Sequence, residues 1–342
     1  MLALAGMAGL MAQPAGAATT LNGAELYSVE TVKFGRWEIR MKVAATPGSV
    51  SSFFTYYNNS YLGSPEPWRE IDIEILGKNG KGFQSNLLTG NAAVKTSSEI
   101  FHATNDDLTA GFHTYVLDWT PDSIVYRIDG VTVRTTPGSN AQVKDLSDQP
   151  HSYRMNLWAS TAAEWVGALD PEKLPVIQTV NWMTYSAYTP GQGPNGSNFT
   201  TKWTDDFASL NSSRWALGNW TFDQNMADFT ADNARVSNGY LMLFLSKKGW
   251  SGTLVPPNDP LGSSRPTSIE SQAPGVRFFA EAVGDRLNVN VGDRMSEAVV
   301  STLSGRVLAR SAGSGILEFK DLPRGCILMV RTALGSRLVP MP

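Results

Sequence analysis

Three acidic residues alternate with isoleucines in the segment from Trp68 to Leu76. Glu70, Asp72 and Glu74 are each separated by one isoleucine. Side chains of a β-strand alternate between its two faces, so this spacing predicts a strand with three carboxyl groups on one face and isoleucines on the other. Like charges at neighbouring positions of one face repel each other, and a purely structural strand gains nothing from them. Two carboxyl groups in different protonation states are what cleavage of a glycosidic bond requires.

The spacing of the two glutamates indicates which type of glycosidic bond cleavage they could perform. Residues of a strand rise about 3.3 Å each, so the Cα atoms of Glu70 and Glu74 should lie roughly 13 Å apart. Side chains that lean toward each other could bring the carboxyl groups within roughly 5–6 Å. Retaining glycosidases hold theirs about 5–5.5 Å apart and inverting enzymes hold theirs farther apart, so a retaining reaction is favoured. Asp72 between them should raise the pKa of at least one of these carboxyl groups. The alternative is the solvated polar face of an ordinary strand.

The elements around this strand are mostly further strands. Between residues 21 and 188, short runs of alternating apolar and polar residues are separated by turn formers, and Asp129-Gly130 is typical of a hairpin turn. Residues 189–198 are rich in Gly and Pro and predict an exposed connection. Strands resume between residues 203 and 247. We therefore predict an all-β fold, an antiparallel sandwich or jelly roll.

Both ends of the chain differ from this central part. Residues 1–17 are apolar, too short to span a bilayer, and end in Ala15-Gly16-Ala17, which predicts a signal peptide; the alternative is a hydrophobic arm of the fold. Residues 250–274 predict a linker, and residues 275–342 a small separate β-domain. The single cysteine, Cys326, excludes an internal disulfide framework.

The remaining composition limits the partners and cofactors. A net charge of −3 gives no indication of nucleic-acid binding. His102, His113 and His151 are spread along the chain without ligand spacing, so we expect structural roles for them and no zinc site. We expect a secreted monomer that acts on a polysaccharide, without a membrane partner.

The acidic strand and several other segments together resemble glycoside hydrolase family 16. Trp68 to Lys78 is similar to the catalytic strand of the lichenases, in the form without a β-bulge. Six other segments agree with this subgroup: Gly23–Tyr27, Val50–Tyr56, Gly82–Asn86, Phe112–Tyr115, Asp118–Pro121 and Met155–Trp158. Segments similar to Phe207–Trp215 and Asn238–Leu243 come first in ordinary lichenases but follow the connection at residues 189–198 here. The resemblance, over roughly residues 20–250, is to the circularly permuted lichenases of rumen bacteria.

The resemblance assigns roles to individual residues. It implies a retaining endo-hydrolase of mixed-linkage β-1,3-1,4-glucans, with Glu70 as nucleophile, Glu74 as general acid/base and Asp72 as a partner that tunes the pair. The substrate-binding positions that it implies are Glu25, Phe54, Tyr56, Asn58, Trp68, Gln84, Asn86, Arg154, Asn156, Trp158, Trp220 and Asp223. Pattern alone would place Trp158 and Trp220 in the core. The permuted relatives carry an acid where this chain has Asn219.

The family resemblance also implies a structural Ca²⁺ and leaves alternatives. Its ligand positions match Asn181, Asp206 and Gly239, partly through backbone oxygens. A transglycosylase, a laminarinase and a non-catalytic glucan-binding lectin share the fold and stay open as functions. Residues 275–342, the tail of the chain, resemble the small C-terminal sorting domains of the type IX secretion route. A carbohydrate-binding module is the competing interpretation of the tail, although residues 275–342 contain no Trp or Tyr.

Overall fold

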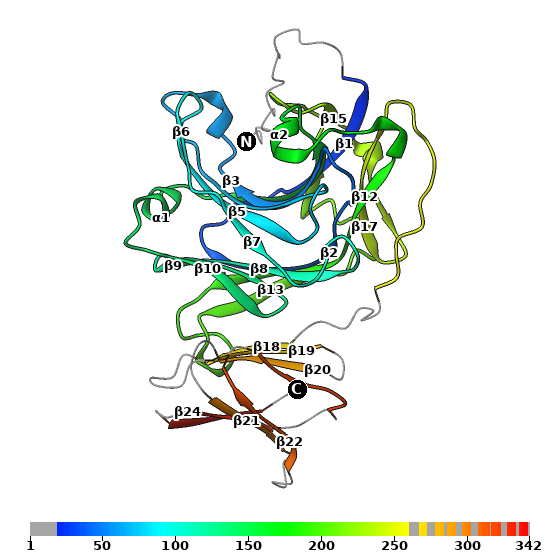
Figure 1. Ribbon diagram of the computed structural model, residues 1–342. Helices are drawn as coiled ribbons and strands as arrows, with labels where there is room; N and C mark the ends of the chain where they lie inside the picture. Colours follow the sequence, from blue (N-terminus) through cyan, green and yellow to red (C-terminus); the bar gives the residue numbers. More distant parts are fainter. Residues whose placement is uncertain are drawn as a thin grey trace.

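The structure of the protein is a computed structural model. It describes residues 19–259, 267–271, 278–283, 286–291, 296–301, 307–314, 316–322, 327–332 and 335–340. The predicted signal segment at residues 1–17 and Cys326 lie outside the described residues. The part up to residue 259 consists of two curved antiparallel layers, with β3 and β5 in the upper layer of Figure 1 and β8, β9, β10 and β13 in the lower one. The predicted antiparallel sandwich is therefore confirmed.

The upper layer is the sheet that contains the acidic strand. Its hydrogen-bonded order is β14-β1-β11-β3-β4-β5, with β6 and β7 both paired to β5. The bounds are β1 Leu21–Ser28, β3 Ser49–Tyr56, β4 Glu70–Leu76, β5 Gly82–Gly90, β6 Lys95–Ser97, β7 Ile100–Ala103, β11 Ser152–Ala159 and β14 Trp215–Leu217.

The lower layer packs against the back of this sheet. Its order is β16-β17-β12-β2-β8-β9-β10, and β13 continues along β12 beyond β17. The bounds are β2 Gly35–Lys42, β8 His113–Trp119, β9 Ser123–Ile128, β10 Val131–Pro137, β12 Val176–Tyr188, β13 Phe199–Asp205, β16 Ala234–Ser237 and β17 Tyr240–Lys247. At one end β1 also pairs with β15 (Ala227–Phe229) and β17, which joins the two layers.

Turn chemistry predicted from the sequence explains two of the hairpins. Asp129 and Gly130 between β9 and β10 both have positive φ, at 45° and 80°. Asn238 and Gly239 between β16 and β17 have φ of 52° and 75°. Such paired positive angles match the right-handed twist of the flanking strands, which is why Asn-Gly and Asp-Gly favour two-residue hairpins. The predicted hairpin at Asp129-Gly130 is confirmed, and Asn238-Gly239 forms a second hairpin of the same kind.

Helical segments are short and lie in the connections. They are η1 Ser60–Leu62, α1 Ala141–Leu146, α2 Ala163–Val166, η2 Pro171–Lys173, η3 Pro194–Gly196 and η4 Ala231–Asn233. None of the helices in the described ranges combines the length and apolar character needed to cross a membrane.

The core between the layers comes from the inward faces of both sheets. Ile71, Ile73 and Ile75 of β4 are fully buried there, opposite apolar side chains of β2 such as Trp37 and Ile39. Burial of each large aliphatic side chain stabilises the fold by roughly 1.5–3 kcal/mol. The core thereby holds the backbone of β4 and leaves its acidic face toward the open side of the upper sheet.

The described residues after residue 259 form two four-stranded sheets. Their orders are β18-β19-β20-β23 and β22-β21-β24-β25. The bounds are β18 Thr267–Ser271, β19 Phe278–Val283, β20 Arg286–Asn290, β21 Ser296–Ser301, β22 Val307–Gly313, β23 Ile316–Phe319, β24 Ile327–Thr332 and β25 Gly335–Pro340. A separate apolar cluster that includes Leu287 and Val289 packs among them. The structure differs from the predicted linker at residues 250–274, because β18 lies within that range and pairs with β19.

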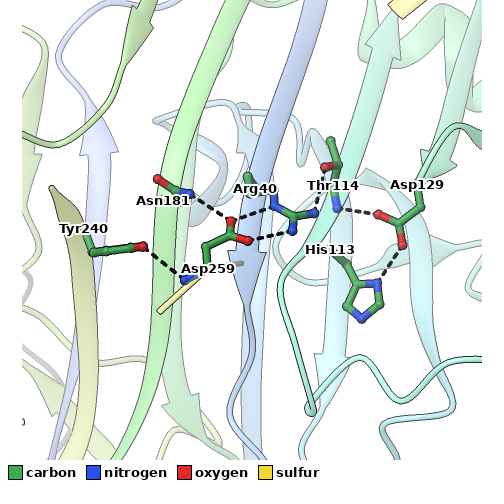
Figure 2. Close-up of polar contacts among 7 residues, drawn as sticks. All are labelled: Arg40, His113, Thr114, Asp129, Asn181, Tyr240 and Asp259. Carbon is green, nitrogen blue, oxygen red and sulfur yellow. Dashed lines mark hydrogen bonds and ion pairs between the residues drawn. The ribbon is translucent and has the colours of Figure 1, made fainter. Parts of the chain in front are cut away.

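Within the first ten residues of that predicted linker, Asp259 is bound to the lower layer. The Asp259 carboxylate is fully buried and forms a two-pronged ion pair with Arg40 of β2, at 2.8 and 2.9 Å. The side-chain nitrogen of Asn181 on β12 donates to the same carboxylate at 2.8 Å, and the Asp259 N–H donates to the Tyr240 hydroxyl (Figure 2). The folded part of the chain therefore extends at least ten residues beyond β17, whose last residue is Lys247.

Candidate active site

The acidic strand β4 pairs in an unbroken register with both neighbours. Glu70, Asp72 and Glu74 stand opposite Tyr56, Phe54 and Ser52 of β3. On the other side they stand opposite Leu88, Asn86 and Gln84 of β5. Directly opposed residues of antiparallel strands project from the same face. Because the isoleucines of β4 face the core, all three carboxyl groups face the open side of the sheet, as predicted.

Glu70 is held by the tryptophan that precedes its strand. The Trp68 indole Nε1 donates a hydrogen bond to Glu70 Oε2 at 2.8 Å. Burial raises the pKa of Glu70 to about 7, against the opposing effects of the Trp68 hydrogen bond and of the Lys95 and Arg154 charges. A buried carboxylate with a fixed donor and nearby cations can ionise at neutral pH and act as a nucleophile.

Glu74 lies in a more negative environment. Burial raises its pKa to about 8, and the charges of Glu70 and Glu99 add to this effect. Burial together with the charges of Glu70, Glu74 and Glu99 holds the pKa of Asp72 well above its usual range. Of the two glutamates, Glu74 therefore keeps its proton to the higher pH, as a general acid must, while Glu70 ionises first.

A second polar cluster lies on the neighbouring strands of the same face. Arg154 of β11 donates to Glu25 of β1 at 2.9 Å and to Asn58 at 2.8 Å. The side-chain nitrogen of Asn156 donates to the second carboxylate oxygen of Glu25 at 3.2 Å, and Ser52 donates to the oxygen of Asn156. These bonds fix polar groups beside the carboxyl groups of β4, where they could bind sugar hydroxyls.

Aromatic side chains border this polar floor. The Trp220 ring lies 5.3 Å from that of Tyr27, and the Arg154 guanidinium lies over Tyr27, Tyr56 and Trp220. Trp158 of β11 packs edge-on against Phe222 at 4.9 Å. Flat aromatic faces beside hydrogen-bonding groups suit the alternately apolar and polar surface of a sugar. The aromatic rings and the polar groups beside them together suit the binding of a carbohydrate chain.

Comparison with known proteins agrees with this geometry. The family model described as "Glycosyl hydrolases family 16" matches residues 16–184. The chain carries a glycosyl hydrolase family 16 domain.

Several relatives found in these comparisons are β-glucanases. A β-glucanase of Fibrobacter succinogenes is 47% identical over 232 residues, which is 68% of this chain and 66% of the relative. A β-glucanase of Bacillus amyloliquefaciens is 37% identical over 161 residues, which is 46% of this chain and 61% of the relative. The chain thus spans slightly less than two thirds of the length of these relatives. Among solved structures, the β-glucanase of Bacillus licheniformis matches with a TM-score of 0.40 and 30% identity, over 48% of this chain and 77% of that one.

Three residues of the family 16 domain join the site without having been predicted from the sequence. The Trp165 indole N–H donates to Gln84 Oε1 at 3.0 Å, and the ring lies 6.0 Å from that of Trp158. Glu99 accepts a hydrogen bond from the nitrogen of Gln84 and raises the pKa of Glu74. Lys95 lies over the ring of Trp68. Trp165 and Glu99 lie outside the named strands and Lys95 begins a short one, so no alternating pattern marks them.

Other predicted binding residues bind a neighbouring segment or are exposed to solvent. Asn86 uses its side-chain oxygen to accept from Ser97 and from the N–H of Ser98, so it orients the segment after β6. Asp223 is exposed on the loop between β14 and β15. Asn219 is exposed on the same loop. Of the predicted binding residues on this loop, Asp223 is thus exposed, whereas Trp220 packs against Tyr27.

The predicted metal positions, of which Asp206 and Gly239 lie beyond the residues matched to family 16, are on the other layer. Asp206 follows β13 and Gly239 precedes β17, and the carbonyl oxygen of Asp206 lies 3.8 Å from where a Cβ of Gly239 would stand. Asn181 of β12 donates its side-chain nitrogen to Asp259, so only its oxygens could be ligands. Among the residues that the structure describes, no three or more acidic, His or Cys side chains converge to hold a metal.

Proposed function

We propose that this protein is a retaining endo-β-glucanase that hydrolyses mixed-linkage β-1,3-1,4-glucans. The observation that carries the proposal is the register of β4, in which Glu70, Asp72 and Glu74 follow each other on one face without a bulge. Laminarinases of family 16 commonly carry an extra residue in this strand, so the unbroken register favours the lichenase type. The names of the relatives support β-glucan as the substrate class.

In the proposed reaction Glu70 attacks the anomeric carbon while Glu74 gives its proton to the leaving glycosidic oxygen. This step forms a covalent glycosyl-enzyme ester and releases the first product. Glu74, now ionised, takes a proton from water, whose oxygen displaces Glu70 from the anomeric carbon and regenerates both carboxyl groups. The raised pKa of Asp72 favours its protonated form between them, which limits the repulsion among neighbouring charges.

Substrate and product analysis tests this proposal directly. Purified protein should release reducing ends from barley β-glucan and lichenan, and far fewer from laminarin or carboxymethylcellulose. Proton NMR of the first products should give the β-anomer, because two displacements retain configuration. Redistribution of chain lengths without new reducing ends would indicate a transglycosylase instead, and binding without any product would indicate a lectin.

The pH dependence follows from the order in which the two glutamates ionise. Activity requires ionised Glu70 and protonated Glu74, so kcat/KM should fall as pH drops through about 7 and again as pH rises through about 8. The acid and alkaline limbs of this pH profile belong to the coupled pair of glutamates rather than to either residue alone. Initial rates on barley β-glucan across pH 5 to 10 check this, and a profile that keeps rising to pH 10 would contradict the role of Glu74.

We also propose that the catalytic layers are circularly permuted, as the resemblance implies. The family match ends at residue 184, just before the connection at residues 189–198, while the match to the Fibrobacter enzyme is 232 residues long. Strands β14, β15 and β17 come after this connection yet pair with β1 at the other end of the chain. A circularly permuted variant cut at residue 194, with residues 19 and 259 joined by a flexible linker so that Asp259 is kept, should retain the fold, as judged by its unfolding curve and activity.

A structural Ca²⁺ and export from the cell complete the proposal. Calcium would be held by oxygens of Asn181, Asp206 and Gly239, and the position of the Asp206 carbonyl oxygen beside Gly239 supports two of these three ligands. If so, Ca²⁺ but not Mg²⁺ should raise the thermal midpoint of protein that was first treated with a chelator. For export, the apolar residues 1–17 should be absent from the N-terminus of protein collected outside the cells.

A further inference from the structure

A lysine covers the indole that binds the proposed nucleophile. Lys95 Nζ lies 3.5 Å from the centroid of the Trp68 ring. The same indole donates its N–H to Glu70 at 2.8 Å. The ring of Tyr56 meets Trp68 edge-on, with the centroids 5.6 Å apart. Trp68 therefore lies among a cation, an aromatic edge and the carboxylate that it binds.

The backbone brings this lysine to Trp68. The N–H of Trp68 donates to the carbonyl oxygen of Gly90 at 2.8 Å, and Gly90 is the register partner of Lys95 across the β5–β6 hairpin. Gly90 has a φ of +102°, and a Cβ there would stand 2.3 Å from the carbonyl oxygen of Val94. A tight hairpin closed by this glycine thus places the first residue of β6 beside the tryptophan that precedes β4.

The charge of Lys95 acts on the nucleophile in the direction that the reaction needs. Burial raises the pKa of Glu70, and the Trp68 hydrogen bond and then the Lys95 charge oppose this rise. The charged or titratable groups around Glu70 are Lys95 of β6, Arg154 of β11, Glu25 of β1, Tyr56 of β3, and Asp72 and Glu74 of β4 itself. Lys95 and Arg154 are the cations of this set, and Arg154 already pairs with Glu25.

We propose that Lys95 is a positioning residue of the active site, which holds the Trp68 indole in the orientation that binds Glu70 and helps to keep that nucleophile ionised. A cation over the face of a tryptophan is attracted by the negative face of the ring. This proposal rests on the proposed hydrolysis by Glu70. The competing interpretation is a mobile surface lysine, because its side chain is exposed and a sugar ring could displace it.

Substitutions at residue 95 separate these two interpretations. Lys95→Met keeps the length of the side chain and removes the charge, whereas Lys95→Arg keeps both the charge and the contact with the ring. The acid limb of kcat/KM should move to higher pH by about half a unit in Lys95→Met. At pH values below that limb, kcat/KM should fall about threefold, and Lys95→Arg should behave like the wild type. The fall should lie in kcat rather than in KM.

A second measurement follows the nucleophile without turnover. An activated 2-fluoro oligoglucoside should label Glu70, and intact mass gives the labelling rate as a function of pH. This rate should show the same shift in Lys95→Met. Lys81→Met is the matched control, since Lys81 binds the backbone oxygen of Asn105 and touches none of these groups.

The outcomes separate the failure of this inference from that of the proposed function. An unchanged acid limb in Lys95→Met, or an equal shift in Lys95→Arg, would overturn the positioning role. A change of KM alone would make Lys95 a substrate contact and also overturn it. If the wild type neither hydrolyses β-glucan nor is labelled at Glu70, the proposed function itself fails.

Discussion

Replacement of Glu70 by glutamine is expected to lower the rate of β-glucan hydrolysis by on the order of 10⁴-fold or more. The amide still accepts the hydrogen bond of Trp68, but it cannot form the glycosyl ester. A loss of 10⁴ corresponds to about 5.5 kcal/mol of transition-state stabilisation. The fold should be retained, because the change removes a negative charge beside Asp72 and Glu74. Reducing-sugar assays and the unfolding curve of the same preparation measure both effects.

A small external nucleophile then distinguishes the two glutamates. In Glu70→Ala, azide would take the place of the removed carboxylate and attack the anomeric carbon in a single displacement. The product should therefore be the α-glycosyl azide. In Glu74→Ala, azide would displace the glycosyl ester formed by Glu70 and give the β-glycosyl azide. Glu172→Gln is the matched control, because Glu172 forms an exposed ion pair with Lys247. Azides of the opposite configurations would mean that the roles of Glu70 and Glu74 are reversed.

Replacement of Asp259 by alanine is expected to lower the free energy of unfolding of the catalytic layers by about 3–5 kcal/mol. The guanidinium of Arg40 is almost completely buried and would lose both oxygens of its partner carboxylate (Figure 2). Asn181 would lose its bond to the carboxylate as well, whereas the backbone N–H of residue 259 can still donate to the Tyr240 hydroxyl. Urea unfolding followed by tryptophan fluorescence measures this, since all ten tryptophans lie at or before residue 250 and none reports on the tail.

Two further variants show whether the burial of the charge causes the loss. Glu172→Ala breaks an exposed ion pair with Lys247 and should cost less than about 1 kcal/mol. The double change of Arg40→Met and Asp259→Leu removes both charges and should recover most of the stability, as replacement of buried pairs by apolar residues often does. If Asp259→Ala unfolds at the same urea concentration as the wild type, residues 250–259 are not docked on the lower layer in solution.

The position of Asp259 also bears on how the tail is connected. Trp250 packs against Phe244 with the ring centroids 5.1 Å apart, and Arg235 donates to the carbonyl oxygen of Gly252 at 2.8 Å. The segment is thus held at its beginning and at Asp259. The connection therefore begins after Asp259 and ends where β18 begins. It is shorter at both ends than the linker predicted at residues 250–274.

The sequence by itself determined the chemistry of β4 and much of the strand pattern. Alternation of acids and isoleucines is a property of neighbouring residues, so the face of Glu70, Asp72 and Glu74 follows from the period of a strand alone. The hairpin turns at Asp129-Gly130 and Asn238-Gly239 also follow from local backbone preferences. These features depend on residues a few positions apart, and nothing distant could change them.

The tertiary structure decided which residues distant in sequence lie beside Glu70, Asp72 and Glu74 or stabilise the layers that hold them. Trp165 reaches Gln84 across 81 positions of sequence, and Asp259 reaches Arg40 across 219. The approach of Lys95 to Trp68 depends on the register of the β5–β6 hairpin and on the hydrogen bond from Trp68 to Gly90. Such contacts are set by how the sheets pair and close on each other, and a single sequence carries no local pattern that indicates them.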